Sequence, residues 1–252
     1  MERFSAAFLR ANDDLVRQYI WSADPLHAWS RKYEYVWHAE AVRAALPPAR
    51  AAAVAATWPD QAAAPAPQEA PFLVLDAGSG FTFFDQFLGS RLGVSVVALD
   101  SANYTLFFGG LMGALLQGEA EVPPIPFVQA PIERTGLLDA SVDAITCVSV
   151  LEHLPVPNLL LTVAEFHRIL KPRGRLFITF DTGQGPPAKG IKESGTLLAA
   201  LRAQFAEDTS HGAPEAAAEA REDVSRLFHN RRANPPEYIE LLFSVSAHVF
   251  VK

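Results

Sequence analysis

The sequence has little of what several common classes of protein require. A single cysteine, Cys147, excludes an internal disulfide. The seven histidines and this cysteine show no metal-ligand spacing, so no metal is expected. No stretch reaches the roughly 18 apolar residues of a membrane-spanning helix. Lys and Arg number 21 against 28 Asp and Glu, and the net charge of −7 offers no basic surface for nucleic acid or an anionic membrane.

Half of the 252 residues are hydrophobic, which is enough for one large domain, or for a domain with an appendage. The amino terminus carries charges throughout and does not have the form of a secretory signal. Cys147 lies in an apolar run and is expected to be a buried, inert thiol, in keeping with a reducing compartment. We therefore expect a cytoplasmic protein. Nothing in the sequence indicates its oligomeric state.

Residues 1–70 differ in composition from the remainder of the chain. Up to about residue 43 the sequence is aromatic and has helical periodicity, with Glu34 and His38 on faces other than the apolar one, and His38 is expected to be solvated. Two interpretations stay open: a helical layer packed on the domain, or a lid in which Tyr33 and Tyr35 reach a ligand. Residues 44–70 are rich in Ala and Pro, with a helix expected at 49–57 and then a stiff linker.

From residue 71 apolar runs alternate with amphipathic segments, which is typical of a parallel sheet covered by helices on both faces. The expected strands are 72–76, 94–100, 127–129, 143–149 and 175–181, and the expected helices are 83–92, 103–117 and 158–170, the last capped by Asn158. Further helices are expected at 194–205 and 214–228, followed by an antiparallel strand at 244–251. A sixth strand has two candidate positions, 206–209 and 238–243.

The most informative stretch is Phe72–Gly80, an apolar run that passes into Asp76 and then into Gly78-Ser79-Gly80. Glycines at this point let the chain turn sharply and expose backbone N–H groups to a ligand. The next strand also ends on an acid, Asp100, which is placed to accept hydrogen bonds from ribose hydroxyls. Together these residues predict a nucleoside site at the carboxyl ends of two neighbouring strands.

The spacing of the glycines bears on which nucleoside this is. A dinucleotide fingerprint needs a third glycine where this chain has Phe83. The carboxylate of Asp76, two residues before the first glycine, is also a poor neighbour for a pyrophosphate. A ligand with an amino group and no phosphate suits Asp76 far better.

These residues resemble the class I S-adenosylmethionine-dependent methyltransferases. The resemblance covers about residues 72–181 and rests on four segments: Val74-Leu-Asp-Ala-Gly-Ser-Gly80, Asp100, Val150-Leu-Glu-His-Leu154 and Arg168-Ile-Leu-Lys-Pro-Arg-Gly-Arg-Leu176. It implies an α/β, Rossmann-like, doubly wound sheet of seven strands, mostly parallel with an antiparallel last strand, here with an N-terminal helical cap at residues 1–70 and the methyltransferase domain at 71–252.

The resemblance also implies the site residues and the cofactor, S-adenosyl-L-methionine. Asp76 and the turn would hold the methionine part, and Asp100 the ribose. The full implied set is Asp76, Ala77, Gly78, Ser79, Gly80, Asp100, Ser101, Ala130, Pro131, Ile132, Val148 and Ser149, in which Ala130–Ile132 flank adenine and Val148 and Ser149 lie beside the methionine. Members of the family often have a glycine in place of Thr82 and an acid near Gln129, so adenine N6 would need a backbone carbonyl or another side chain here.

The acceptor side of the site is less clearly marked. His153 follows the fourth strand and is the candidate general base or substrate anchor, while the alternative is a purely structural role in the loop before Pro155. Methyl transfer to an acceptor that is already nucleophilic depends mainly on alignment. Asp181 ends the fifth strand, beside the expected acceptor entrance.

We therefore expect a methyltransferase that moves a methyl group to an O, N or C nucleophile of a small-molecule acceptor, with no nucleic-acid or membrane partner. Two rivals stay open. One is a protein that binds S-adenosylmethionine without catalysis. The other is a nicotinamide-dependent oxidoreductase.

Overall fold

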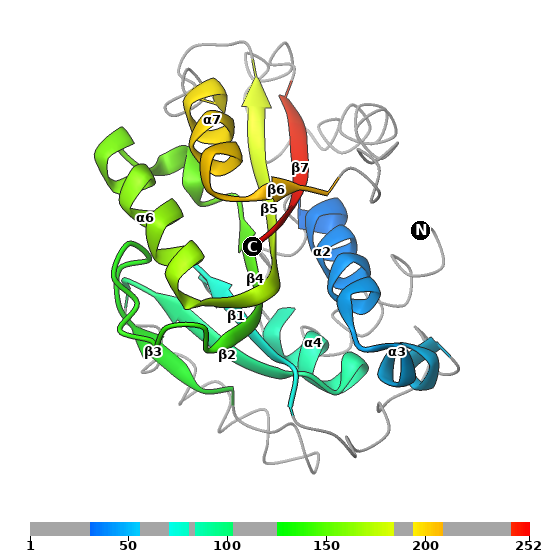
Figure 1. Cartoon of the computed structure of the whole chain (residues 1–252). Coiled ribbons are helices and arrows are strands. Elements are labelled where there is room, and N and C mark those ends of the chain that lie inside the picture. Colours follow the sequence, from blue (N-terminus) through cyan, green and yellow to red (C-terminus); the bar gives the residue numbers. More distant parts are fainter. Residues whose placement is uncertain (1–30, 56–70, 81–83, 103–124, 184–193, 209–242) are drawn as a thin grey trace, which may run out of the picture.

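A single mixed sheet forms the framework of the molecule (Figure 1). The computed structural model describes residues 31–55, 71–80, 84–102, 125–183, 194–208 and 243–252. The strands are β1 (Leu73–Ala77), β2 (Ser95–Asp100), β3 (Phe127–Gln129), β4 (Val142–Val148), β5 (Leu170–Gly183), β6 (Ala206–Glu207) and β7 (Phe243–Val251). The helices are α2 (Arg31–Ala45), α3 (Pro48–Ala55), α4 (Phe84–Leu92), the 3-10 helix η2 (Leu151–His153), α6 (Val156–Ile169) and α7 (Ser194–Gln204).

The strand order, β3-β2-β1-β4-β5-β7-β6, fixes where a ligand can bind. Strands β1 to β5 pair in parallel, and β7 is antiparallel to both of its neighbours. From β1 the chain builds outward to β2 and β3, and then returns to the other side of β1 with β4. In an open sheet of this kind the crevice at such a switch point, at the carboxyl ends of the strands, is the ligand site. Here the switch lies between β1 and β4.

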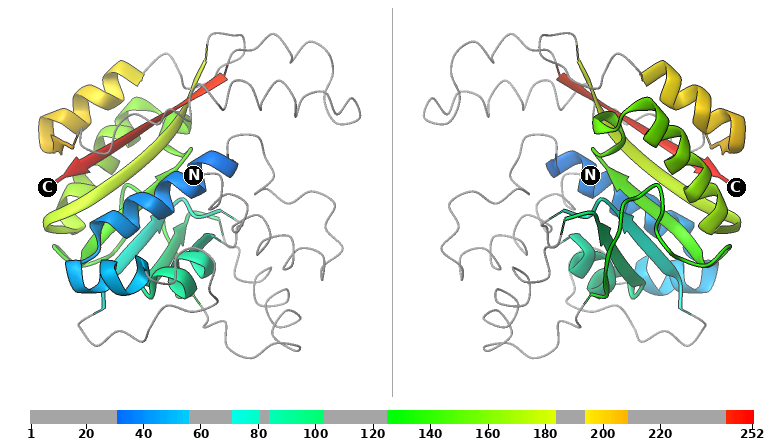
Figure 2. Two further views of the ribbon diagram at one scale, coloured as in Figure 1. Left: turned by 90° about the vertical axis from the view of Figure 1, so that its right-hand side faces the viewer. Right: turned by 90° about the vertical axis from the view of Figure 1, so that its left-hand side faces the viewer.

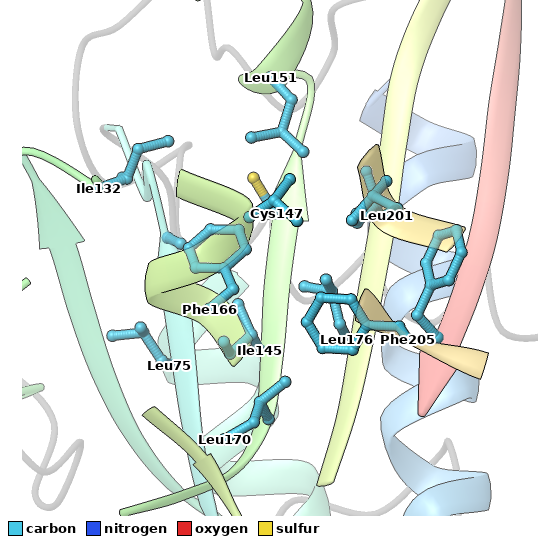
Figure 3. Packing of buried hydrophobic residues seen from close by; sticks show 14 of the residues in the cluster. Leu75, Ile132, Ile145, Cys147, Leu151, Phe166, Leu170, Leu176, Leu201 and Phe205 are labelled. Carbon is cyan, nitrogen blue, oxygen red and sulfur yellow. The ribbon is translucent and has the colours of Figure 1, made fainter. Parts of the chain in front are cut away.

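Alternation along the strands divides the core into two layers. Val74, Ala144 and Phe177 face a cluster shared with α2, α3 and α4. Their neighbours Leu75, Ile145 and Ile178 face a second cluster, shared with α6 and α7. Figure 2 shows the sheet between these two groups of helices, and Figure 3 shows Phe166 of α6 beside Leu75 and Ile145 in the second cluster. Both faces are covered, as the continuous apolar strands predict.

Most of the expected elements are confirmed. Each of the first five expected strands lies within a few residues of an observed strand, the late strand is antiparallel, and the sixth is Ala206–Glu207. The helices expected at 103–117 and 214–228 lie outside the described residues. None of the helices that the structure describes is long and apolar enough to cross a membrane.

Asn158 does not cap α6, and that prediction is wrong. The helix begins earlier, at Val156, with Pro155 at the cap position and Pro157 in the first turn. Proline fits there because the first N–H groups of a helix have no intrahelical partner and its ring already has a helical φ. The Asn158 side chain instead donates to Glu133 Oε1 at 2.7 Å, which ties α6 to the loop after β3.

The polar side chains of α2 are placed differently from what the sequence predicts. Glu34 and His38 are 1% and 0% exposed, so the expectation that His38 is solvated is wrong. The helix packs on β4 and β5, and the ring of Tyr35 lies 4.6 Å from that of Phe84 at the start of α4. Helix α2 is therefore part of the layer on the sheet. Glu34 and His38 are buried because they meet polar atoms of the turn after β4 and of β5, respectively.

Candidate functional site

The carboxyl ends of β1 and β2 bring Asp76 and Asp100 to one edge of the sheet, as the sequence predicts. The two strands pair in register, with Asp76 opposite Ala98. Asp100 Oδ2 accepts from the Gly80 N–H at 3.0 Å and Oδ1 from the Ala102 N–H at 2.9 Å. Each carboxylate oxygen keeps a further lone pair. The side chain is therefore held in one orientation while it can still accept hydrogen bonds from a ligand.

The turn Gly78-Ser79-Gly80 is built from backbone groups. The N–H groups of Gly78 and Ser79 both donate to Leu99 O, at 2.7 and 3.0 Å. Gly78 has φ +75°, and a Cβ there would lie 2.5 Å from Val150 Cγ2. Gly80 has φ +59°, and a Cβ there would meet no atom of the described residues within 4 Å. Gly78 is thus required by packing as well as by conformation, whereas Gly80 leaves space beside the backbone.

Asp76 is a buried acid, 3% exposed, on the face of the sheet covered by α4. Its Oδ1 accepts from Thr146 Oγ1 at 2.7 Å. Burial raises the pKa of Asp76 to about 6, the negative charge of Asp100 adds to this, and the hydrogen bonds from Thr146 and Asp85 oppose it. A carboxylate kept in such a place at this energetic cost is typical of a functional site.

Asp85, in the first turn of α4, is the partner of Asp76 that sequence reasoning missed. It is 5% exposed and hydrogen-bonded to Asp76. Burial, and then the charge of Asp76, raise the pKa of Asp85 well above its usual value. Near neutral pH the pair therefore holds one proton, with Asp85 as donor and Asp76 as acceptor, and carries a net charge of about −1. This charge matches a ligand with one nearby cationic group.

Asp85 could be suspected from sequence, because an acid is favoured in the first turn of a helix and the helix after a glycine turn begins near the end of the preceding strand. What the sequence does not show is that Asp85 is buried against Asp76. That contact depends on how α4 lies on the sheet.

The end of β3 lies beside Asp100, where the predicted adenine-flanking residues come together. Ala130 N–H donates to Asp100 O at 3.0 Å, and Gln129 Nε2 donates to Ser101 O at 3.3 Å. Ala130 and Pro131 are half-buried, and Ile132 is 6% exposed. The loop beyond is fixed by Glu165 of α6, whose Oε1 accepts from both N and Oγ1 of Thr135, at 2.8 and 2.6 Å.

Glu165 gives a prediction about stability at low pH. The hydrogen bonds from Arg168, opposed in part by burial and helped by those from Thr135, lower the pKa of Glu165 from 4.5 to about 2. Because the pKa is lower in the folded state, the stabilisation is complete above about pH 4.5 and is lost as the pH falls towards 2. We expect Glu165→Gln to lower the melting temperature at pH 7 and to flatten its fall between pH 4.5 and 3. If the melting temperatures of the two proteins fell by the same amount between pH 4.5 and 3, this prediction would be wrong.

At the end of β4, Val148 and Ser149 are both buried, at 8% and 6% exposure. Ser149 has φ +50°, a left-handed conformation unusual for a residue other than glycine. Its N–H donates to Thr179 O at 2.9 Å, and its Oγ donates to Glu34 Oε1 at 2.6 Å. The turn after β4 is therefore held by β5 on one side and by α2 on the other.

The predicted acceptor residues are more dispersed. His153 is exposed at the end of η2, and its N–H donates to Val150 O at 3.0 Å. Tyr35 is 4% exposed and lies in the core against Phe84. Tyr33 lies in α2 and Asp181 in β5, but their side chains are outside what the structure describes. The structure thus brings the predicted cofactor residues together, whereas the acceptor set stays a prediction.

Two other features lie outside this constellation. Cys147 is buried, and burial, followed by the charges of Glu152 and Asp76, raises the pKa of its thiol well above its usual value, which fits an inert residue. A hollow of about 130 Å³ lies at the opposite edge of the sheet, between the starts of β1, β4 and β5, and contains none of the predicted site residues. Lys171 there is paired with Asp143 at 2.8 Å.

Comparisons with known proteins agree with this geometry. The profile of a family described as "Methyltransferase domain" matches residues 75–178. The Ubiquinone biosynthesis O-methyltransferase of Xanthomonas oryzae pv. oryzae (strain PXO99A) is 34% identical over 108 residues, which are 42% of this chain and 41% of that protein. The chain therefore spans less than half of the curated relatives that it matches.

Solved structures share the fold over a larger part of the chain. The cyclase SpnF superposes with a TM-score of 0.58 at 15% identity, over 97% of this chain and 95% of that one. An S-adenosylmethionine dependent methyltransferase from Mesorhizobium loti gives a TM-score of 0.50 at 16% identity, over 90% of this chain and 99% of that one. At such low identities the likeness is one of fold, and a fold shared with a cyclase does not by itself fix a reaction.

Proposed function

We propose, from the premise that residues 75–178 form a methyltransferase domain of the class I, S-adenosylmethionine-dependent family, that this protein methylates a small-molecule acceptor. The observation that carries the proposal is the juxtaposition of three groups. These are the Asp76–Asp85 pair, the bare backbone at Gly80, and the oriented carboxylate of Asp100. A phosphate-free nucleoside with a cationic amino-acid part complements all three.

Each group has a chemical counterpart in S-adenosylmethionine. The single negative charge of the Asp76–Asp85 pair suits the ammonium or the sulfonium. The free lone pairs of Asp100 suit the two ribose hydroxyls. The remaining contacts that we propose are with Ala77, Ser79 and Ser101 around the turn, Ala130, Pro131 and Ile132 around adenine, and Val148 and Ser149 beside the methionine.

The reaction needs little covalent chemistry from the protein. A lone pair on an O, N or C atom of the acceptor attacks the methyl carbon, and the carbon–sulfur bond breaks with its electron pair left on sulfur. The products are the methylated acceptor and S-adenosylhomocysteine. Holding the acceptor in line with the methyl group and sulfur supplies most of the acceleration. Oxygen is the first acceptor atom to test, because the curated relative is named an O-methyltransferase.

His153 is the residue that we propose to take a proton from the acceptor. It is exposed on η2, which follows β4 at the same edge of the sheet as Asp76. A neutral imidazole has a ring nitrogen that can accept a proton, which suits this role. Tyr33 and Asp181 complete the proposed acceptor side, whereas Tyr35 packs in the core against Phe84 and is not proposed to contact the acceptor. The proposal also keeps the division into a helical segment and linker at 1–70 and a catalytic unit at 71–252, and a cytoplasmic location.

Thermal shift measurements test the proposal directly. A ligand that binds only the folded state raises the melting temperature, and at about 100 times its Kd the gain is about 2.7 kcal/mol. We expect S-adenosylmethionine and S-adenosylhomocysteine to stabilise the protein and NADH to have no effect. The reverse pattern would make the protein an oxidoreductase. Stabilisation without methylation of any phenol, amine or carbon acid in a broad acceptor panel would indicate binding alone.

Asp100 offers a sharper test of the ribose contact. We expect Asp100→Ala to weaken S-adenosylhomocysteine binding at least about tenfold, since a hydrogen bond to a charged group contributes about 1.5–3 kcal/mol. Isothermal titration calorimetry measures this loss. Asp139→Ala is the matched control, because it removes an exposed acid from the loop before β4, at the other edge of the sheet. Equal affinities for the two variants would remove Asp100 from the ribose role.

A further inference from the structure

Helix α2 supplies two buried polar side chains to the carboxyl ends of β4 and β5, although it lies outside the matched residues 75–178. Glu34 Oε1 accepts from Ser149 Oγ at 2.6 Å. One turn further along the helix, His38 Nε2 is hydrogen-bonded to Thr179 Oγ1 at 3.1 Å. We call Glu34, His38, Ser149 and Thr179 the α2 corner.

The α2 corner is closed by backbone as well as by side chains. Val148 and Thr179 are paired across β4 and β5, and the Ser149 N–H donates to Thr179 O at 2.9 Å. Glu34 and His38 of α2 thus meet Ser149 and Thr179, and each of these four residues is less than 9% exposed. The Glu34–Ser149 and His38–Thr179 hydrogen bonds are buried, so the loss of either partner would leave the other partner without that bond away from water.

Ser149 is the strained member of this corner. Its φ of +50° is unfavourable for a residue other than glycine, and such a conformation persists only where the surroundings impose it. Glycine would adopt it freely, so strain alone does not explain a serine here. The hydroxyl that glycine lacks is the group that contacts Glu34. The contact therefore accounts for the serine at this position.

The corner adjoins the proposed donor site. Asp76 is paired with Thr146 in the sheet, and Ser149 comes three residues after Thr146 on the same strand and turn. The side chain of Val150, the residue after Ser149, packs against Gly78. A shift of the Ser149 turn would thus move a wall of the glycine turn as well.

We propose that Glu34 is a positioning residue for the donor site. This role depends on the proposed function. Glu34 acts through Ser149 and keeps the turn after β4 in the shape that the methionine part of S-adenosylmethionine requires. Helix α2 is then a component of the binding site. The helix contributes by holding the turn after β4 through the Glu34–Ser149 contact. This role requires no movement of the helix over a ligand.

Affinity for S-adenosylhomocysteine, measured by calorimetry on the full chain, tests the proposal. We expect Glu34→Ala to weaken binding about tenfold, within the range of coupling between residues in contact. Glu34→Gln should stay within about threefold of the unaltered protein, because its amide oxygen still accepts from Ser149 Oγ. Glu40→Ala is the matched control: it lies on the same helix, but its partner is Arg43, at 2.8 Å.

A double-mutant cycle shows whether the effect passes through Ser149. If it does, Glu34→Ala adds little once Ser149→Gly has removed the hydroxyl. If the two losses add in full, Glu34 acts by another route and the proposal is wrong. A melting temperature for each variant separates loss of binding from loss of fold. If Glu34→Ala does not fold, Glu34→Asp replaces it, because the shorter side chain moves the carboxylate away from Ser149 by one methylene. If Glu34→Asp then bound S-adenosylhomocysteine as tightly as Glu34→Gln does, the proposal would be overturned.

The outcomes also separate this proposal from the proposed function. If the unaltered protein does not bind S-adenosylhomocysteine, the proposed function fails. If it binds, and Asp100→Ala weakens binding while Glu34→Ala does not, the proposed function stands and the role of Glu34 is refuted.

Discussion

Asp76→Asn is expected to make the unliganded protein more stable and to weaken donor binding. Burial raises the pKa of Asp76 from 3.8 to about 6, so the folded state disfavours the charged form. Between these two values the folded state binds more protons than the unfolded chain does, and stability falls as the pH rises. Above about pH 6, where Asp76 is ionised in the folded state, its burial lowers the free energy of unfolding by the full amount. At about 1.36 kcal/mol per pKa unit this loss is about 3 kcal/mol.

Asparagine removes this charge and keeps an oxygen for Thr146 Oγ1. We therefore expect the melting temperature at pH 7.5 to rise by about 5 °C or more, since about 1 kcal/mol shifts a domain of this size by about 2–4 °C. At pH 4 the two proteins should melt at nearly the same temperature. Affinity for S-adenosylhomocysteine should fall roughly 10- to 100-fold, as expected for the loss of an ionic hydrogen bond.

Asp85→Asn is the companion to this variant. Because Asp85 is the protonated member of the pair, its amide replacement keeps a donor towards Asp76 and leaves the charge of the site near −1. It should therefore bind S-adenosylhomocysteine almost as well as the unaltered protein at pH 7.5. If Asp85→Asn is as defective as Asp76→Asn, the pair does not share its proton in the way that we infer.

Among substitutions that add one methyl group to the site, Gly78→Ala is expected to lower the free energy of unfolding most. At φ +75° a side chain costs about 1–2 kcal/mol, and the contact of 2.5 Å with Val150 Cγ2 adds overpacking of about 1–3 kcal/mol. We expect a total loss of about 2–5 kcal/mol in the free energy of unfolding, read from urea denaturation, together with loss of donor binding.

Two further variants divide this loss into its parts. Gly80→Ala has a positive φ but no described neighbour within 4 Å, so it should cost only the conformational part, about 1–2 kcal/mol. Adding Val150→Ala to Gly78→Ala removes the atoms at 2.5 and 2.9 Å and should restore part of the stability. If Val150→Ala makes Gly78→Ala worse, the clash is not the cause.

The sheet could be predicted well because its signals are local. Each parallel strand buried on both faces is a short apolar run, and acids or glycines mark the carboxyl ends of β1 and β2. Once the strands alternate with helices, the rules of parallel sheets place those ends on one edge. The sequence alone therefore places Asp76, Gly78 and Asp100 together.

The buried polar partners could not be predicted in this way. Glu34 meets Ser149 across 115 positions of sequence, and His38 meets Thr179 across 141. On its own helix each looks like an ordinary solvated residue, because helical periodicity shows only which face is apolar. A helix that lies over strand ends and polar turns buries part of its polar face as well. The same reason explains why Asp85 was missed.

The position of β7 has a consequence for how the protein matures. This strand follows both β5 and β6 in chain order, yet it lies between them in the sheet. Until it arrives, β5 exposes a full row of backbone N–H and C=O groups, and the two residues of β6 have no strand to join. An open edge of this kind readily pairs with another chain. A ribosome-bound or proteolytically shortened form that lacks Phe243–Val251 should therefore aggregate or recruit chaperones, even with every proposed ligand contact intact.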